Sequence, residues 1–136
     1  MNIILIGVFI GTMTVTSYRS IPNQTDNSPW HTSTGERVTI RGCAVSRDLL
    51  KANGGPLEYG DLIYVEGFGY RFVNDTMNKR MKQHIDLWVP TYSEERKVGI
   101  TSGKIYLVKR EEVCQKRTNK FGSIVASVMA ILGIFK

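Results

Sequence analysis

Apolar and polar residues alternate over short stretches along most of this chain. From Thr12 onward the sequence runs Thr-Met-Thr-Val-Thr-Ser-Tyr, a period of two that is typical of a strand with one buried face. Residues 3–10, just before it, form a continuous apolar run. They lack a preceding basic region and a following small-x-small cleavage site, so we favour a strand over an uncleaved hydrophobic lead-in.

Strand patterns recur through the middle of the chain, and two short helical segments separate them. The glycines of Gly67-Phe68-Gly69 indicate a tight turn between two strands. The segment 93–99 indicates a short helix that Ser93 caps and Gly99 ends. The strand segments are 37–46, 61–67, 70–75, 85–90 and 103–110, and residues 47–55 form the other helical segment. Many short strands with small helical inserts predict a mainly β fold, a closed or nearly closed barrel.

Length and composition fit one globular domain. The 136 residues are 42% hydrophobic and 22% charged, which is wrong for a disordered chain. The net charge of +6 suits polyanions such as nucleic acid, phospholipid or an anionic wall polymer. An aromatic RNA-binding motif and a basic helix are both missing from the sequence, so nucleic acid is not the expected partner.

Histidine and cysteine are too sparse for metal chemistry. His31 and His84 stand far apart, and neither has a cysteine nearby. We therefore expect no metal site and no cofactor. Cys43 and Cys114 leave two possibilities open, a disulfide in an exported or virion protein or two free thiols.

The C-terminal segment is apolar and uncharged over residues 121–135. As a helix it would span about 22 Å, short of the ~30 Å hydrocarbon core of a bilayer. Gly122, Ala126 and Ala130 recur every four residues, which places small residues along one stripe. We predict a domain at 1–112, followed at 113–136 by a basic linker and an apolar helix. That helix has three possible roles: packing on its own domain, inserting into a membrane, or docking within an assembly.

Two aspartates follow or interrupt apolar stretches, Asp75 after "YRFV" and Asp86 within "IDLWV". Around them, residues 9–110 resemble the three-aspartate domain of bacterial and phage cell-wall proteins. The matching stretches, in order, are "GTMTVTSY", "TDNSPWHTSTGERV", "GCAVSRDLL", "YGDLIYVEGFGYRFVNDTMN", "HIDLWVP" and "KVGITSGKIYLV". The resemblance implies a six-stranded double-psi β-barrel, as in membrane-bound lytic transglycosylase A, rare lipoprotein A, expansins and family-45 endoglucanases.

The family pattern assigns three acids, and this sequence departs from it at two places. Asp75 and Asp86 match the second and third acids. The family's first aspartate directly follows Ala-Val, whereas here Ser46 follows and the nearest acid is Asp48. The usual glycine-rich turn after the second aspartate is replaced by residues 77–80, Met-Asn-Lys-Arg.

A lytic transglycosylase needs a single carboxylic acid of raised pKa, which protonates the glycosidic oxygen and later acts as a base. In the resembling transglycosylase the aspartate of the "HIDLW" strand has this role, which implies Asp86 here. Alternation places Ile85 and Leu87 in the core and Asp86 on the opposite face. We expect Asp75 to raise the pKa of Asp86 by like-charge repulsion.

Several further residues are candidates for binding the sugar or the acid. Thr16 and Tyr18 could hydrogen-bond to the acid or to a sugar, and Trp30 and Trp88 could stack on sugar rings. Thr76 and Asn78 follow Asp75 and complete the candidate set. Structural readings compete with these roles, because a strand-end aspartate often caps a turn, an acid such as Asp48 often starts a helix, and tryptophans often fill cores.

The sequence therefore predicts a peptidoglycan-cleaving lytic transglycosylase that acts on glycan strands. We expect it in the cell envelope or in a phage virion, such as a tail or entry apparatus, and as a homo-oligomer or part of a larger complex. Two alternatives remain, a non-catalytic, expansin-like glycan-binding module and a structural component of a virion or membrane assembly.

Overall fold

The computed structural model describes residues 2–21 and 30–114, which form six strands and three short helices. The strands are β1 (Asn2–Tyr18), β2 (Gly42–Val45), β3 (Leu62–Val65), β4 (Gly69–Thr76), β5 (His84–Trp88) and β6 (Thr101–Val113). The helices are two 3₁₀ turns, η1 (Arg47–Leu49) and η2 (Lys51–Asn53), and α1 (Tyr92–Val98). The prediction of a mainly β fold with short helical inserts is confirmed.

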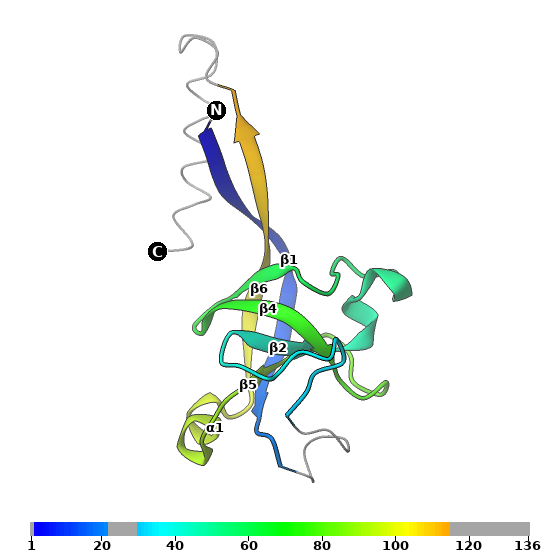
Figure 1. The fold of residues 1–136 in the computed structure, drawn as a ribbon, viewed down its shortest axis with the longest axis vertical. Coiled ribbons are helices and arrows are strands. Elements are labelled where there is room, and N and C mark those ends of the chain that lie inside the picture. Colours follow the sequence, from blue (N-terminus) through cyan, green and yellow to red (C-terminus); the bar gives the residue numbers. More distant parts are fainter. Residues whose placement is uncertain (1, 22–29, 115–136) are drawn as a thin grey trace.

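The six strands close into a barrel in the order β1-β5-β2-β4-β3-β6 (Figure 1). Two neighbouring pairs, β1 with β5 and β2 with β4, run parallel, and the other four pairs run antiparallel. Strands that are distant in sequence therefore become neighbours, and β5 lies between β1 and β2. This order brings the ends of β1, β4 and β5 to the same part of the molecule.

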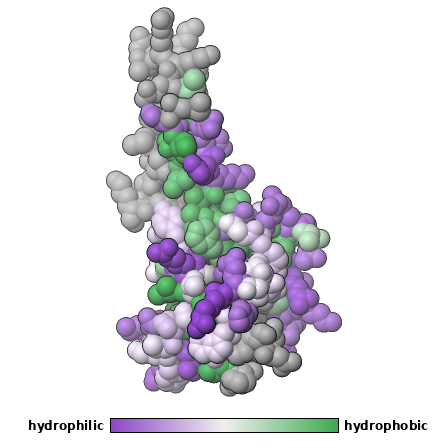
Figure 2. All heavy atoms as spheres, in the orientation of Figure 1, coloured by the Kyte–Doolittle hydropathy of each residue, from purple (hydrophilic) through white to green (hydrophobic). Residues whose placement is uncertain are grey.

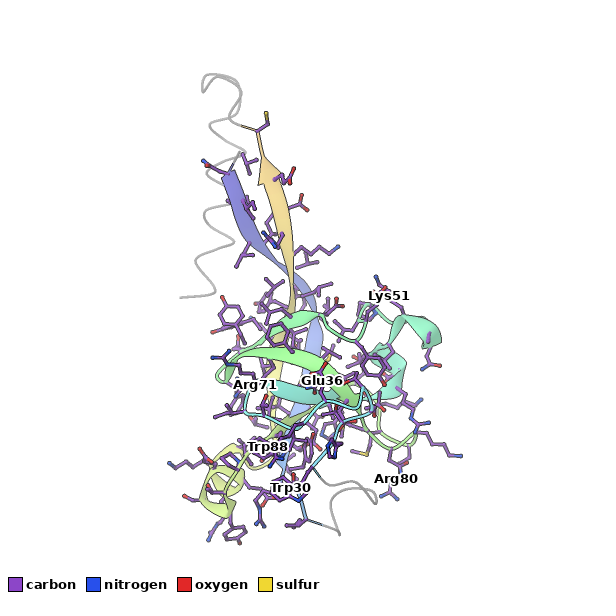
Figure 3. All side chains as sticks on the ribbon, in the orientation of Figure 1. Trp30, Glu36, Lys51, Arg71, Arg80 and Trp88 are labelled. Carbon is purple, nitrogen blue, oxygen red and sulfur yellow. The ribbon has the colours of Figure 1, made fainter. Side chains whose placement is uncertain are left out.

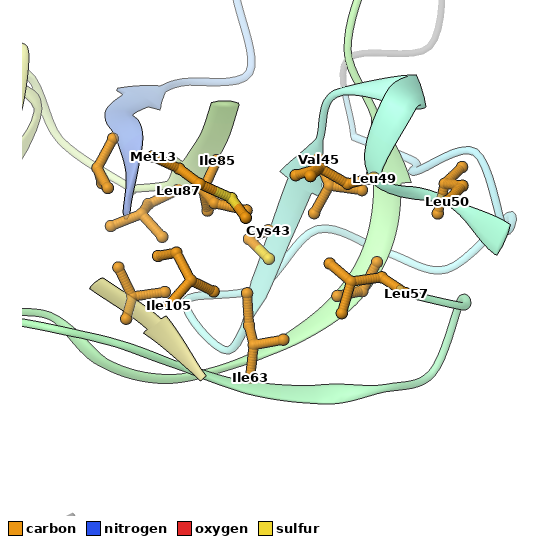
Figure 4. Packing of buried hydrophobic residues seen from close by; sticks show 13 residues of the cluster. Met13, Cys43, Val45, Leu49, Leu50, Leu57, Ile63, Ile85, Leu87 and Ile105 are labelled. Carbon is orange, nitrogen blue, oxygen red and sulfur yellow. The ribbon is translucent and has the colours of Figure 1, made fainter. Parts of the chain in front are cut away.

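Alternating residues of the strands fill the barrel with aliphatic side chains. Met13 and Val15 of β1 point inward, as the period of two predicts, and Cys43 is fully buried beside them. Leucines of the 3₁₀ turns and the following loop extend the core at one end (Figure 4). The cluster comprises Met13, Val15, Cys43, Val45, Leu49, Leu50, Leu57, Ile63, Val65, Val73, Ile85, Leu87 and Ile105.

The first half of β1 and the second half of β6 form a two-stranded arm that extends beyond the barrel (Figure 1). The arm pairs Asn2 with Val113 and continues to Phe9 with Tyr106, whose rings lie 5.5 Å apart. Ile3, Leu5 and Phe9 are exposed on it, and apolar surface follows the arm down to the barrel (Figure 2). Residues 3–10 are thus part of a strand.

The described residues contain no helix that is long and apolar enough to cross a membrane. The prediction of an apolar helix over residues 121–135, with its three possible roles, lies outside the described residues.

Two local predictions were wrong. The strand predicted over 37–46 begins only at Gly42, because the chain turns just before it and the Gly42 amide donates to the carbonyl of Thr39. The cap of α1 is Thr91 rather than Ser93. The Thr91 hydroxyl accepts from the Glu94 amide and donates to the Glu94 carboxylate, so one threonine–glutamate pair closes the first turn.

A β-bulge in β4 decides which way Asp75 points. Cys43 pairs with Val73, but the next residue, Ala44, pairs with Asp75, so Asn74 is an extra residue. Val73 points into the core, and regular alternation would turn Asp75 inward as well. The extra residue reverses this and places Asp75 on the outer face, which is a common use of bulges beside functional sites.

We expect Gly42→Ala to destabilise this bulge by about 1–2 kcal/mol, because overpacking a buried contact costs energy of this order. A Cβ at Gly42 would lie 2.8 Å from Nδ2 of Asn74, which is itself buried. Urea unfolding measures the cost. Asn74→Ala removes the clashing atoms, so the double variant should lose less stability than the two single changes together. Purely additive losses would contradict this packing.

Candidate functional site

Four strands contribute to one row of residues on the outer face of the barrel. Thr16 of β1 pairs with Asp86 of β5, Asp86 pairs with Ala44 of β2, and Ala44 pairs with Asp75 of β4. Residues paired in this way point to the same side of a sheet. The row therefore brings together the two aspartates that the sequence singled out.

Only a small side chain separates the two aspartates along this row. Asp75 and Asp86 flank β2, so their backbones lie about two strand spacings, ~10 Å, apart. Ala44 contributes a single methyl group between them. Ile85 and Leu87, the neighbours of Asp86, are fully buried in the core, in agreement with the alternation of β5.

The carboxylate of Asp86 has one occupied oxygen and one open oxygen. The Thr16 hydroxyl donates to Oδ1 over 2.8 Å, and it is the only described group that hydrogen-bonds to Asp86. Oδ2 has no hydrogen-bond partner among the described residues, and the residue as a whole is partly buried. Oδ2 is therefore the oxygen that remains for a further hydrogen bond.

Burial raises the pKa of Asp86 to about 6, against the lowering effect of the Thr16 hydrogen bond. The charges of Glu95 on α1 and of Asp75 raise it further. The effect of Asp75 has the direction expected from the sequence, but removal from water is the larger cause. A carboxylic acid with this pKa stays protonated up to about pH 6, about two units above an ordinary aspartate, and can donate its proton there.

Asp75 receives donors from three parts of the chain. Its Oδ1 accepts from the amide and hydroxyl of Ser33 and from the Thr76 amide, at 2.9, 2.5 and 2.8 Å. Its Oδ2 accepts from the Tyr18 hydroxyl over 3.4 Å. The loop that carries Ser33 is thereby fixed over the end of β4. Thr76 adds a second contact, because its hydroxyl lies 3.2 Å from that of Ser33.

Tyr18 donates to Asp75 and is affected by the charges of both aspartates. Its side chain is buried, and burial together with the charges of Asp75 and Asp86 raises the pKa of its phenol. The phenol therefore stays protonated and serves as a donor. Thr16 and Tyr18, two residues apart on the same face of β1, contact Asp86 and Asp75 respectively.

His84 is a site residue that the sequence reasoning missed. Its Nε2 lies 2.7 Å from the Thr16 hydroxyl, and its backbone amide donates to the hydroxyl of Ser46 over 3.0 Å. Burial lowers the pKa of the imidazole. Its spacing in His84-Ile85-Asp86 was the available signal, because residues two apart on a strand share a face.

Asp48 takes no part in the network around Asp75 and Asp86. Its Oδ2 accepts from the backbone amide of Gln83 over 3.1 Å and from the Gln83 side chain over 3.2 Å. Gln83 has a positive φ of 47°, which is uncommon for a residue other than glycine. Asp48 therefore stabilises the turn into β5, which is a structural role.

The remaining candidates differ in how much surface they offer. Trp88 is partly buried and donates from Nε1 to the Ser20 hydroxyl over 3.0 Å. Trp30 is 49% exposed, with the Arg37 guanidinium 5.8 Å from its ring centre. Both tryptophans lie in the lower half of the view in Figure 3. Asn78 lies in an exposed loop, where its Oδ1 accepts from the Arg80 amide.

Both histidines and both cysteines of the chain lie within residues 2–21 and 30–114. These residues hold no group of three or more His, Cys, Asp or Glu side chains arranged for a metal ion. Both cysteines are free; Cys114 is exposed, and burial raises the pKa of the Cys43 thiol to about 12. Cys43 is therefore an unreactive core residue.

No family model matches this chain, and a search of the curated proteins found no match. The function must be argued from the site itself.

Proposed function

We propose that the protein is a peptidoglycan-cleaving lytic transglycosylase with Asp86 as its single acid and base, built on a double-psi β-barrel. The observation that carries the proposal is the state of Asp86: an outward carboxyl group with a pKa of about 6, one oxygen held by Thr16 and the other open. The two parallel strand pairs within a closed six-stranded barrel support the fold proposal.

In the proposed reaction the protonated Asp86 donates its proton to the glycosidic oxygen as the bond from that oxygen to C1 of the sugar breaks. Positive charge develops at C1. The C6 hydroxyl of the same sugar then attacks C1 and gives its proton to the carboxylate of Asp86. The product carries a 1,6-anhydro ring, the acid is regenerated, and no water is consumed.

Asp75 and Tyr18 would assist this reaction from the next strands. Asp75 accepts hydrogen bonds at both carboxylate oxygens, from Tyr18, Ser33 and Thr76. These bonds fix the orientation of the carboxylate and of its negative charge. Such a charge stabilises a positive centre that forms beside it. The Tyr18 phenol, on the same face of β1 as Thr16, donates to Asp75.

Peptidoglycan also fits the charge of the chain, because its peptides carry carboxylates and the net charge is +6. The exposed loop after β4 contains Lys79, Arg80 and Lys82. We propose that the protein acts on this polymer in the cell envelope, either as an envelope protein or delivered from a phage virion.

Digestion of purified sacculi tests the proposed function. We expect mass spectrometry to find 1,6-anhydro ends after incubation with the protein. Ordinary reducing ends would show hydrolysis instead, and binding to sacculi without any cleavage would identify a glycan-binding module. Absence of both binding and cleavage would leave a structural role.

The rate of cleavage should fall as pH rises through the pKa of Asp86. Only the protonated acid can start the reaction, so we expect a decrease of about tenfold for each pH unit above about 6. Initial rates of anhydro-end formation between about pH 4 and pH 8, roughly two units either side of that pKa, measure this profile. A rate that rises through this range would contradict the role of Asp86 as an acid.

A further inference from the structure

The hydroxyl of Thr16 lies between two partners. It donates to Oδ1 of Asp86 over 2.8 Å, and Nε2 of His84 lies 2.7 Å from the same oxygen. A threonine hydroxyl has a single proton. When the Asp86 carboxylate is ionised, that proton is directed to it, and the short contact with His84 then requires a proton on Nε2, which donates to Thr16.

The donor direction along the hydrogen bonds from His84 through Thr16 to Asp86 determines which carboxylate oxygen of Asp86 can hold a proton. Oδ1 already accepts from Thr16, so a proton on Oδ1 would face the hydroxyl proton of Thr16. Oδ2 has no donor among the described residues. The acid proton is therefore placed on Oδ2, the oxygen that remains for a substrate.

We infer that His84 is a positioning residue whose Nε2–H, acting through Thr16, confines the acid proton of Asp86 to the open oxygen Oδ2. The inference deepens the proposed function and depends on it only for its catalytic consequence. The alternative arrangement reverses both hydrogen bonds: Asp86 donates from Oδ1 to Thr16, and Thr16 donates to a bare Nε2. The acid proton would then point away from the substrate.

Burial leaves His84 a single N–H to donate. Burial lowers the pKa of the ring and favours a neutral imidazole, whose one N–H lies on either Nδ1 or Nε2. The contact with Thr16 places this N–H on Nε2 when the Asp86 carboxylate is ionised. Besides Thr16, the groups that act on Asp86 are Glu95 of α1, Asp75 of β4 and the Tyr18 phenol of β1. The two charged groups among them, Glu95 and Asp75, are acidic. The hydrogen bond from the Thr16 hydroxyl, which itself accepts from Nε2–H of His84, is therefore the main feature that favours the ionised form of Asp86.

The proton on Nε2 can be observed directly by ¹H–¹⁵N NMR of the histidine side chains in the full-length chain. The chain has two histidines, and His31→Gln assigns the signals, because His31 is exposed and lies outside the hydrogen-bonded chain of His84, Thr16 and Asp86. We expect Nε2 of His84 to carry a proton both below and above the titration of Asp86. A bare Nε2 at either end, or a proton that moves to Nδ1 as Asp86 is protonated, would overturn the inference.

Matched variants test the catalytic consequence. Thr16→Val removes the hydroxyl and should lower kcat about tenfold with little change in KM, whereas Thr16→Ser should keep most of the activity. His84→Gln retains an N–H donor and should exceed His84→Leu in kcat. Equal kcat for valine and serine at position 16 would contradict the positioning role. An inactive wild-type protein with a protonated Nε2 would contradict the proposed function but would still support the hydrogen-bond assignment.

Discussion

Asp86→Asn should abolish the formation of anhydro ends and, at the same time, make the protein more stable above pH 6. The amide cannot donate an acidic proton, so we expect the cleavage rate to fall by about a thousandfold or more. The amide oxygen can still accept from Thr16, so the local structure should persist.

The gain in stability follows from the raised pKa of Asp86. The folded state holds the proton up to about pH 6, whereas an unfolded chain releases it near pH 4. The free energy of unfolding of the wild type therefore falls as pH rises between these values and stays low above them. Asp86→Asn removes this loss, which we put at about 3 kcal/mol well above pH 6 and close to zero below pH 4.

Urea unfolding at low and neutral pH, combined with the sacculus assay, measures both effects. Asp61→Asn is the matched control, because Asp61 accepts one backbone hydrogen bond, from Glu58, and lies outside the row of Thr16, Asp86 and Asp75. The control should retain its activity. An Asp86→Asn variant that is less stable than the wild type at neutral pH would show that Asp86 is a structural residue.

Gly55→Ala should destabilise the protein by about 4 kcal/mol, a larger loss than the one expected for Gly42→Ala. A Cβ at Gly55 would overlap the carbonyl carbon of Leu49 and lie 2.5 Å from the carbonyl oxygen of Asp48. These are backbone atoms, and the Leu49 side chain is anchored in the core, so they cannot move aside. The same loop holds Asp48 against Gln83 at the start of β5.

Gly54→Ala provides the comparison for this prediction. Gly54 has a φ of 85°, but a Cβ there would meet no atom within 4 Å. Its cost is therefore limited to the strain of a left-handed alanine, about 1 kcal/mol. Thermal and urea unfolding of the two variants separate the effects. Equal losses at positions 54 and 55 would contradict the packing described.

Sequence periodicity was sufficient to predict which residues point inward where a strand has one buried face. The alternation in β5 placed Ile85 and Leu87 inside and Asp86 outside, and the alternation from Thr12 gave the inward residues of β1. Such patterns depend only on which face of the strand is buried, and apolar and polar residue types mark the buried and exposed faces.

Features that depend on tertiary contacts could not be predicted in this way. The bulge at Asn74 follows from pairing with a distant strand, although it alone turns Asp75 outward. Ser33 reaches Asp75 through the fold of a loop, and Asp48 was assigned to the site although it serves the backbone of Gln83. His84 required the distance to Thr16, a residue 68 positions away.

The fold keeps Asp86 in its acid form up to about pH 6. A ¹³C NMR titration of its side-chain carboxyl, assigned with Asp86→Asn, measures this in the intact protein. We expect a midpoint at about 6. A midpoint at or below about 4, the value of an ordinary solvated aspartate, would contradict the account.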